Sequence, residues 1–464
     1  MFRYDIVAGQ VREWIATGVL KPGDRLLSVR EMSAKQGFSS VTVHQAYGLL
    51  QDEGIIESRP RSGFFVAEQA RQLPEFADPL EDLSVDEAVA SERGGPAQLF
   101  RHSGGAGLAS LYLSEDLQPL DDLYRLMANH LRWEHARSER LDWRGSEELR
   151  EAIAKRSTAT SATARARDII VTRSVADSIG LCLDLLAPRG SNILVETPTD
   201  AATVAAVLDR GLNCVEIYSH PRYGVDPDQF QYLIENNTIA ACVLSPCNHA
   251  PTGVSYSMDA ARRIAEAATR GGVPIIENIA GQDLHYGAAP HNLSQFDTRN
   301  LVVRVGGLED ALGPRFGAGW VSYVRRDHHK FLVQRSLTAG EWARQRAIAA
   351  FISSRSYDRH LRRLRESVSS RTRKGLSLIF QHFPESCTVS RPTGGFMCWV
   401  RGPKAFNAIE AARRAEERGV AFSPGPLFSV SHAFGNFIAL NLSVAWTPET
   451  ERQIQEIGRR LLQT

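Results

Sequence analysis

The residues with the greatest chemical consequence lie in a glycine-containing loop that follows the apolar run Leu301-Val302-Val303. From Arg304 to Trp320 the sequence reads RVGGLEDALGPRFGAGW. Glycines permit positive φ angles and let backbone N–H groups approach an anion closely, so a loop of this composition is suited to a small ligand. The alternative is a structural crossover between two buried segments. An amine nucleophile is missing, because no lysine occurs between Lys155 and Lys330.

The elements that must position this loop are short apolar runs that alternate with helical patterns. Repeated strand–helix–strand order predicts an α/β domain with a mostly parallel sheet between helices. Ligands bind at the carboxyl ends of such strands, and polar residues follow several of them, so the sequence predicts a small-molecule pocket there. The expected strands are Ile169–Val171, Ile193–Val195, Cys214–Ile217, Ala240–Leu244, Ile275–Glu277, Leu301–Val305 and Gly319–Tyr323.

The first 66 residues predict a separate unit with a different chemistry. Apolar residues at helical spacing indicate a first helix. A second helix opens with a capping box, Ser28 and Glu31, and ends at Gly37. Ser39 and Ser40 offer the N-cap of a third helix, and two short strands follow around a turn. This order is that of a winged helix-turn-helix, whose third helix fills the major groove of DNA.

The stretch KPGDRLLSVREMSAKQGFSSVTVHQAYGLLQDEGIIESRPRSGFFV resembles the DNA-binding domain of the GntR family of bacterial regulators. Leu27 replaces the usual proline and Ser40 a frequent arginine, which affects base reading rather than fold. The resemblance implies phosphate clamps at Arg30 and Arg61. The full set of implied DNA contacts is Arg30, Ser39, Ser40, Thr42, His44, Gln45, Arg61 and Gly63, with Thr42, His44 and Gln45 as candidate base readers. The alternative is a protein-interaction module.

Length and composition limit the class of protein. A chain of 464 residues predicts two or three domains, and 43% hydrophobic with 23% charged residues is typical of a soluble globular protein. No apolar run approaches 18 residues, and the amphipathic start is unlike a signal peptide. Six scattered cysteines without a CxxC pair are typical of a reducing cytosol. We therefore expect a cytoplasmic protein without membrane contact, and no metal site.

Five stretches in order carry a second resemblance, which covers nearly all of residues 107–464. They are LDWRGSEELREAIA, VETPTDAATVAAVLDRG, LSPCNHAPTGVSYSMDAARRIAEAA, PIIENIAGQDLHY and RPTGGFMCWV. Together they are similar to a fold type I aminotransferase, and behind a GntR-type head they resemble the MocR architecture of bacterial regulators. The resemblance implies a homodimer, often head-to-tail, that binds a double-stranded DNA operator with two paired half-sites.

These observations divide the chain into four parts. Residues 1–66 form the winged helix-turn-helix, and the acidic, then glycine-containing segment 67–106 reads as an extended linker. Residues 107–334 form the aminotransferase-like large domain. Residues 335–464 form a small α+β domain, with a helix over 357–378, short strands near Val389, 397–400, 421–423 and 437–442, and a final helix from Glu449.

The aminotransferase resemblance also implies that the catalytic residues are lost. These enzymes bind pyridoxal phosphate through a lysine, whose position falls on Asp310, and hold its ring nitrogen with an aspartate, whose position falls on Asn278. Four further positions of the aminotransferase site also carry other residues in this chain, namely Ala250, Ala280, Asp200 and Ala439. The expected effector pocket comprises Ser174, Val175, Ala176, Asp200, Asn248, Asn278, Asp310, Arg315 and Ala439; a solvated surface position is the alternative for Arg315.

The sequence thus leads to one main hypothesis and two alternatives. The main hypothesis is a bacterial transcription regulator whose aminotransferase-like domain dimerises and senses a small molecule, without catalysis and without a covalently bound cofactor. In the first alternative the regulator still binds pyridoxal phosphate, non-covalently or with residual chemistry. In the second, the carboxy-terminal domain is purely a dimerisation scaffold.

Overall fold

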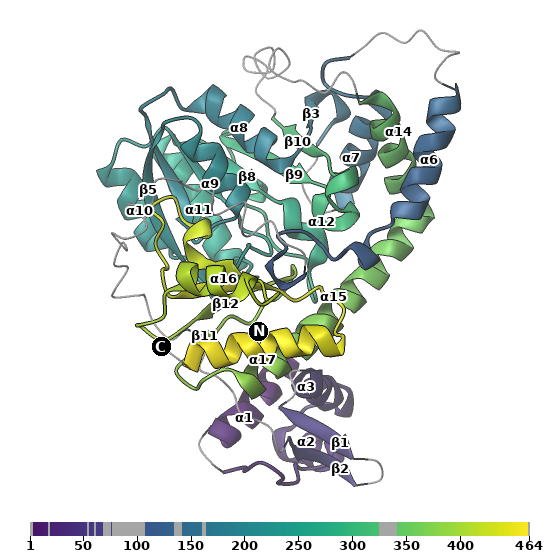
Figure 1. The fold of residues 1–464 in the computed structure, drawn as a ribbon, viewed down its shortest axis with the longest axis vertical. Helices are drawn as coiled ribbons and strands as arrows, with labels where there is room; N and C mark the ends of the chain where they lie inside the picture. The colour runs from purple at the N-terminus through teal and green to yellow at the C-terminus, as the bar shows by residue number, and fades with distance from the viewer. Residues whose placement is uncertain are drawn as a thin grey trace.

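The computed structural model describes residues 3–16, 19–52, 55–59, 62–67, 76, 107–133, 142–159, 164–323 and 341–462. Within these residues the strands form a two-stranded, an eight-stranded and a four-stranded sheet. Each sheet belongs to a different part of the molecule: the amino-terminal unit, the large domain and the small domain (Figure 1).

The amino-terminal unit is the expected winged helix-turn-helix. Its elements are α1 (Arg3–Ala16), α2 (Val29–Gln36), α3 (Ser40–Asp52), β1 (Ile56–Arg59) and β2 (Gly63–Val66). The capping box is present, because the Glu31 N–H donates to Ser28 Oγ while the Ser28 N–H donates to the Glu31 carboxylate. Gly37 ends α2 at φ 71°, a left-handed conformation that glycine adopts without strain. Apolar residues of all three helices, among them the fully buried Tyr47, fill one core.

The eight strands of the large domain lie in the order β3-β10-β9-β8-β7-β4-β5-β6. The five strands from β9 to β5 are parallel, while β10 is antiparallel to both of its neighbours. All seven expected strands are found. The bounds of these seven strands and of the additional short strand β6 are β3 (Ile169–Thr172), β4 (Asn192–Thr197), β5 (Asn213–His220), β6 (Gly224–Val225), β7 (Ala241–Leu244), β8 (Ile275–Asn278), β9 (Val302–Gly307) and β10 (Gly319–Ser322).

Helices cover both faces of this sheet, because alternate side chains along each strand point to opposite faces. Val195 packs in one core with residues of α8 (Val175–Leu186) and α9 (Ala201–Leu208). Its neighbour Leu194 packs in another core with α10 (Pro227–Asn236) and α11 (Met258–Gly271). The near-continuous apolar runs of the sequence follow from this burial on both sides.

The small domain is an antiparallel sheet with helices beside it. Its strands have the order β11-β12-β14-β13, and α15 (Arg355–His382) extends into it from the large domain (Figure 1). Trp399 and Ile438 are fully buried in its interior. The remaining elements are β11 (Thr388–Val389), β12 (Met397–Arg401), β13 (Ser423–Pro424), β14 (Phe437–Asn441), α16 (Ala408–Glu416) and α17 (Pro448–Leu462).

The domain boundaries differ from the expected ones at two places. The expected boundary at 334/335 lies outside the described residues, but α14 (Trp342–Ile352), which follows it, packs against α6 (Leu120–Trp133) and α7 (Glu147–Ala159) of the large domain. Conversely, residues 107–113 lie against the small-domain sheet, where the Asn441 side chain donates to the carbonyl groups of Ser110 and Tyr112. The spacing of apolar residues predicts helices and strands, but it does not show which hydrophobic core a short segment packs into.

The expected linker is described at Ala67 and Phe76 only, and Phe76 is not in an extended tether. Its ring is 4% exposed and stacks on Phe437 with centroids 6.2 Å apart, and the Arg401 guanidinium lies 5.6 Å from its centroid. An aromatic side chain in an acidic segment buries enough apolar surface to fix that point of the chain. The segment is therefore attached to the small domain at residue 76.

Candidate ligand pocket and DNA-binding surface

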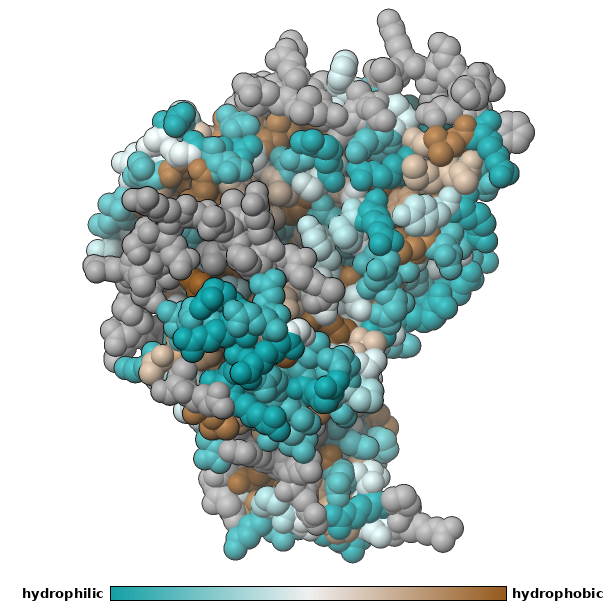
Figure 2. Space-filling view, in the orientation of Figure 1, coloured by the Kyte–Doolittle hydropathy of each residue, from teal (hydrophilic) through white to brown (hydrophobic). Residues whose placement is uncertain are grey.

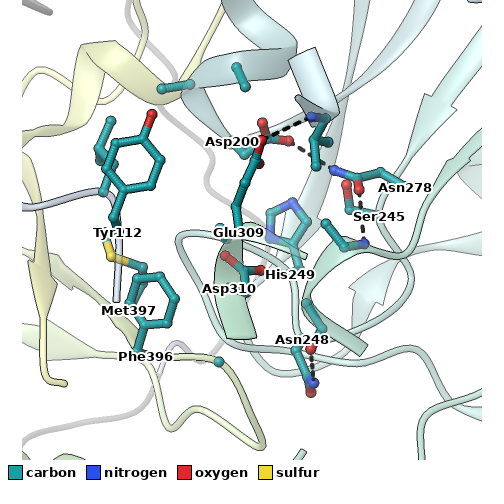
Figure 3. A pocket seen from close by; sticks show the side chains of 18 of the residues that line it. Tyr112, Asp200, Ser245, Asn248, His249, Asn278, Glu309, Asp310, Phe396 and Met397 are labelled. Carbon is teal, nitrogen blue, oxygen red and sulfur yellow. Dashed lines mark hydrogen bonds between the residues drawn. The ribbon is translucent and has the colours of Figure 1, made fainter. Parts of the chain in front are cut away.

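A cavity of about 480 Å³ lies at the carboxyl ends of the parallel strands, where the sequence places a pocket. Residues that directly follow or end β7, β8 and β9 form its floor, and the first residues of α8 and α9 form one side. Segments 110–112 and 394–397, together with Phe428, close the opposite side (Figure 3). The cavity thus lies between the large and small domains.

Seven of the nine expected pocket residues line this cavity. Several of them lie far apart in the sequence and meet because the strands that carry them are parallel. The seven are Ser174, Val175, Ala176, Asp200, Asn248, Asn278 and Asp310. Ala250 and Ala280, which replace family residues, line it as well.

The structure places the other two expected residues elsewhere. The Arg315 side chain is 53% exposed and pairs with Glu115 at 2.8 Å, because the short turn after Gly313 directs it outward. Arg315 therefore occupies the surface position that was its alternative assignment. Ala439 is fully buried in β14, opposite Trp399 in the small-domain sheet. Both residues were therefore assigned to the pocket wrongly.

The amino terminus of α8 is already occupied by an anion from this chain. Ser174 caps the helix by accepting a hydrogen bond from the Asp177 N–H at 3.1 Å. The Val175 N–H donates to Glu309 Oε1 at 3.3 Å. Since helix amino termini attract anions, the Glu309 carboxylate takes the place that a ligand phosphate would otherwise use.

Asn278 is held by its neighbours rather than free to bond a ring nitrogen. Its Nδ2 donates to Asp200 Oδ2 at 3.3 Å, and its Oδ1 accepts from the Ala280 N–H at 3.1 Å. Asp200 in turn caps α9, accepting from the Thr203 N–H at 2.9 Å and from its hydroxyl at 2.6 Å. The two side chains form one small network on the pocket wall (Figure 3).

Asn248 has a structural position beside the cavity. It adopts φ 45°, and its Nδ2 donates to the Gly281 carbonyl at 2.7 Å, which ties two loops together. The Ser255 hydroxyl donates to its Oδ1 at 3.1 Å. Gly394 packs so closely that an added Cβ would lie 2.1 Å from Asn248 Oδ1. This contact allows segment 394–397 to close over the cavity.

Two adjacent carboxyl groups face the interior of the cavity. Burial, followed by the nearby charge of Asp310, raises the pKa of Glu309 to about 7. Burial, followed by the charge of Asp200, raises the pKa of Asp310 to about 6. Asp310 has no hydrogen bond or ion pair with any residue that the structure describes. Among the described residues that line the cavity there is no lysine or arginine.

Sequence reasoning missed several residues of the pocket. Glu309 was passed over beside Asp310, although two consecutive acidic residues in a ligand loop are a usable signal. Tyr112, Phe396, Met397 and Phe428 supply the apolar side. Tyr112 and Phe428 come from short segments that show no periodicity, so the sequence offered no signal for them. Phe396 and Met397 lie in the stretch RPTGGFMCWV, which carried the resemblance but was not linked to the pocket.

The surface expected to read DNA is the first half of α3. The Ser39 hydroxyl accepts from the Thr42 N–H at 3.1 Å and lies 2.9 Å from the Thr42 hydroxyl, so both side chains cap the helix. Gly63 begins β2 at φ 104°, and Arg61 lies outside the described residues. Of the residues expected to contact DNA, five are exposed to solvent: Arg30, Ser39, Ser40, His44 and Gln45. Val41, which was missed, is 68% exposed among them and suits a thymine methyl group.

Metal and membrane sites are not evident in the described part of the chain. There, no group of three or more His, Cys, Asp and Glu side chains could hold a metal ion. The helices of that part include none that is long and apolar enough to cross a bilayer.

Two protein families match different parts of the chain. Residues 3–66 match the gntR family of bacterial regulatory proteins. Residues 118–438 match aminotransferase class I and II. The two matches correspond to the winged unit and to the two domains that enclose the cavity.

Individual proteins resemble the chain over nearly its full length. The HTH-type transcriptional regulator YdcR of Escherichia coli is 27% identical, with 99% of each chain covered. The probable rhizopine catabolism regulatory protein MocR of Rhizobium meliloti is 25% identical, with 89% of this chain and 85% of that protein covered. The α-aminoadipate aminotransferase LysN of Thermus thermophilus, solved with N-(5'-phosphopyridoxyl)-L-leucine, has a TM-score of 0.71 at 20% identity, covering 82% of this chain and 98% of its own.

Proposed function

This chain belongs to the aminotransferase class I and II family and carries a gntR-type DNA-binding domain, and on that premise we propose that it is a ligand-responsive transcription regulator of the MocR type without aminotransferase activity. The observation that carries the proposal is the alignment with a helix-turn-helix regulator over 99% of both chains. The winged unit binds operator DNA, and the cavity between the large and small domains binds the effector.

The loss of catalysis is supported by the side chains of the cavity. Transamination requires an amine that forms an imine with the cofactor aldehyde, and Asp310 offers a carboxylate instead. Pyridoxal phosphate does not fit these residues, because Glu309 accepts the hydrogen bond of the first α8 N–H and the described lining residues include no lysine or arginine to pair with a phosphate. The pocket therefore serves recognition and not group transfer.

The footprint of the protein on DNA tests the regulator proposal. The full chain is incubated with the DNA upstream of its own gene, with and without candidate ligands, and digested with a nuclease. We expect protection of two half-sites. Absence of any protected site under all these conditions would contradict the proposal.

Residual binding of pyridoxal phosphate is the competing function. The observation in its favour is that Ser174, Val175 and Ala176 still line the cavity at the start of α8. We expect no change in the absorption spectrum of pyridoxal phosphate when the protein is added, and no adduct after borohydride reduction. An adduct mapped to a cavity residue would overturn the loss of catalysis.

A homodimer is the expected assembly. Its support is apolar surface beside α6, where Tyr124 and Leu131 are 50% and 47% exposed, and Figure 2 shows hydrophobic colour in that region at the upper right. Tyr112, at 48% exposure, lines the cavity as well. Light scattering on the purified chain should give twice the mass of 51.3 kDa. A monomer at micromolar concentration would contradict this assembly.

A further inference from the structure

We infer that the ligand of the cavity is a small organic amine in its protonated form, with an apolar body and without a carboxylate of its own. The inference rests on the proposed function of a ligand-responsive regulator and specifies the chemical class of the effector. It is carried by the charge, the unused hydrogen-bond acceptors and the apolar lining of this cavity.

The charge of the cavity selects a cation. Asp200, Glu309 and Asp310 all contribute carboxyl groups to the lining, and among the lining residues that the structure describes no lysine or arginine balances them. Figure 3 shows the side chains of Glu309 and Asp310 directed into the space between Tyr112 and Asn278. An ammonium group among these oxygens would be stabilised, whereas a second anion would be repelled.

The carboxylate oxygens of Asp310 are available to accept hydrogen bonds from a ligand. Asp200 already accepts hydrogen bonds from Thr203 and Asn278, and Glu309 accepts one from Val175. Asp310, in contrast, makes no hydrogen bond or ion pair within the described residues, although burial raises its pKa. A carboxylate that faces the cavity without a partner keeps its acceptor sites free, and an ammonium ligand has three N–H donors with which to satisfy them.

The opposite side of the cavity suits the apolar body of such a ligand. Tyr112, Phe396 and Phe428 present aromatic rings there, and Met397 adds a thioether. Aromatic faces attract cations as well as apolar groups, and methionine adapts to irregular shapes. The volume of about 480 Å³ lies within the range of sites for small organic ligands.

The same lining disfavours amino acids. A ligand carboxylate requires a cationic partner or free N–H donors, and the α8 amino terminus is taken by Glu309. Arg315, which might have paired with a carboxylate, instead binds Glu115 at the surface. An amine should therefore bind more tightly than the amino acid with the same side chain. A bare metal ion is disfavoured too, because the described residues do not form a metal-binding cluster.

Matched ligands test the inference on the full chain at pH 8. Three amines, 2-phenylethylamine, 3-methylbutylamine and 1,5-diaminopentane, are compared by calorimetry and thermal shift with phenylalanine, leucine, lysine and 3-phenylpropionate. We expect saturable binding of at least one amine, at least tenfold weaker binding of its amino acid, and none of the carboxylate. Binding of the carboxylate or an amino acid more tightly than the amines, or binding of none of the three amines, would overturn the inference.

Variants locate the site. Asp310→Asn should weaken amine binding at least tenfold while leaving the melting temperature equal or higher, because it removes a charge that lies near the Asp200 carboxylate and makes no hydrogen bond within the described residues. Glu115→Gln, on the surface beside Arg315, should leave the affinity unchanged. Equal affinity of Asp310→Asn and the unmodified chain would refute the assignment. A DNA footprint without amine binding contradicts this inference alone, whereas amine binding without any footprint contradicts the regulator proposal.

Discussion

Glu309 and Asp310 are neighbours in sequence but differ in how their charge is compensated. Glu309 accepts a hydrogen bond from Val175 at the start of α8, where the helix dipole favours an anion. Asp310 points into the cavity without such a partner among the described residues. Both pKa values are nevertheless raised, first by burial and then by a neighbouring carboxylate, which is Asp310 for Glu309 and Asp200 for Asp310. The unliganded pocket therefore stores unfavourable electrostatic energy.

The contribution of Glu309 to the stability of the unliganded protein should become less favourable as pH rises, and Glu309→Gln should remove this pH dependence. The pKa of Glu309 is about 7 in the folded chain and 4.5 for an ordinary glutamate. Between these values the folded state holds more protons, so stability decreases through this window and the penalty is complete above pH 7. We expect a gain of about 1 to 3 kcal/mol at pH 8 and little change at pH 4.5.

Chemical denaturation at the two pH values measures this effect. Glu115→Gln is the control, because Glu115 is 65% exposed and pairs with Arg315 outside the cavity. A loss of stability in Glu309→Gln at pH 8 would show that the hydrogen bond from Val175 outweighs the burial of charge.

Restoring an amine at position 310 should not restore catalysis. In Asp310→Lys, the new ammonium group would pair with the carboxylates of Glu309 and Asp200, and Asn278 would still lack the charge that holds a ring nitrogen protonated. We expect no transfer of an amino group from any tested donor to a keto acid. Turnover above the unmodified chain would mean that the substitution at 310 alone abolished the activity.

The sequence predicted residues at strand ends well and residues of short segments poorly. Asp200, Asn278 and Asp310 each lie next to an apolar run or a recognisable motif, and parallel strands bring such positions together. Tyr112 lies in an aperiodic segment whose partner sheet is more than 300 residues away. Ala439 was placed by its match to a family arginine, and its short side chain lies in the hydrophobic core and does not line the cavity.

At the scale of elements, α3 combines two roles along its length. Its first turn is fixed by the hydroxyl groups of Ser39 and Thr42, and its buried side, including Val43 and Tyr47, packs against the other helices. The exposed side chains of the first half are thereby presented on a rigid helix. The winged fold was predictable from the sequence because caps, apolar stripes and turns all agree there.

Two glutamines on α3 provide a matched pair for DNA binding. Gln45 lies on the exposed side of the first half, and Gln51 is exposed near the carboxyl end of the same helix. If Gln45 reads a base edge, Gln45→Ala should weaken operator binding by about 1 to 3 kcal/mol. Gln51→Ala should leave it unchanged, since the end of the helix lies away from the groove.

Titration of labelled operator DNA at fixed salt checks the difference, and melting temperatures confirm that both variants fold. Equal affinity of the two variants would remove Gln45 from the set of base readers.

At the scale of the whole molecule, a row of aromatic rings connects the linker with the ligand cavity. Phe76 stacks on Phe437, whose ring centroid lies 5.3 Å from that of Trp399. Trp399 in turn contacts Phe428 at 5.5 Å, and Phe428 lines the cavity. Because close-packed interiors transmit strain, we expect this row to couple the ligand cavity to the linker.

Phe76→Ala should test this link. Removing a buried phenylalanine ring should lower the free energy of unfolding by about 3 kcal/mol. We also expect the bound amine to have less influence on operator affinity. The control is Phe383→Ala, a similarly buried ring in the other core of the small domain. An equal effect of both variants on the response to ligand would assign the change to stability and not to the aromatic row.

The anchoring of Phe76 also sets a limit on operator geometry. Ten peptide units join Val66, the last residue of the wing, to Phe76. Fully extended, they span at most about 36 Å, roughly one helical turn of DNA. Each DNA-binding unit can therefore lie only a short distance from its anchor at Phe76. In a dimer, the two short connections limit the distance between the two DNA-binding units. Such a protein should reject half-sites moved apart by several turns, and lengthening the chain between residues 67 and 75 should restore binding to them.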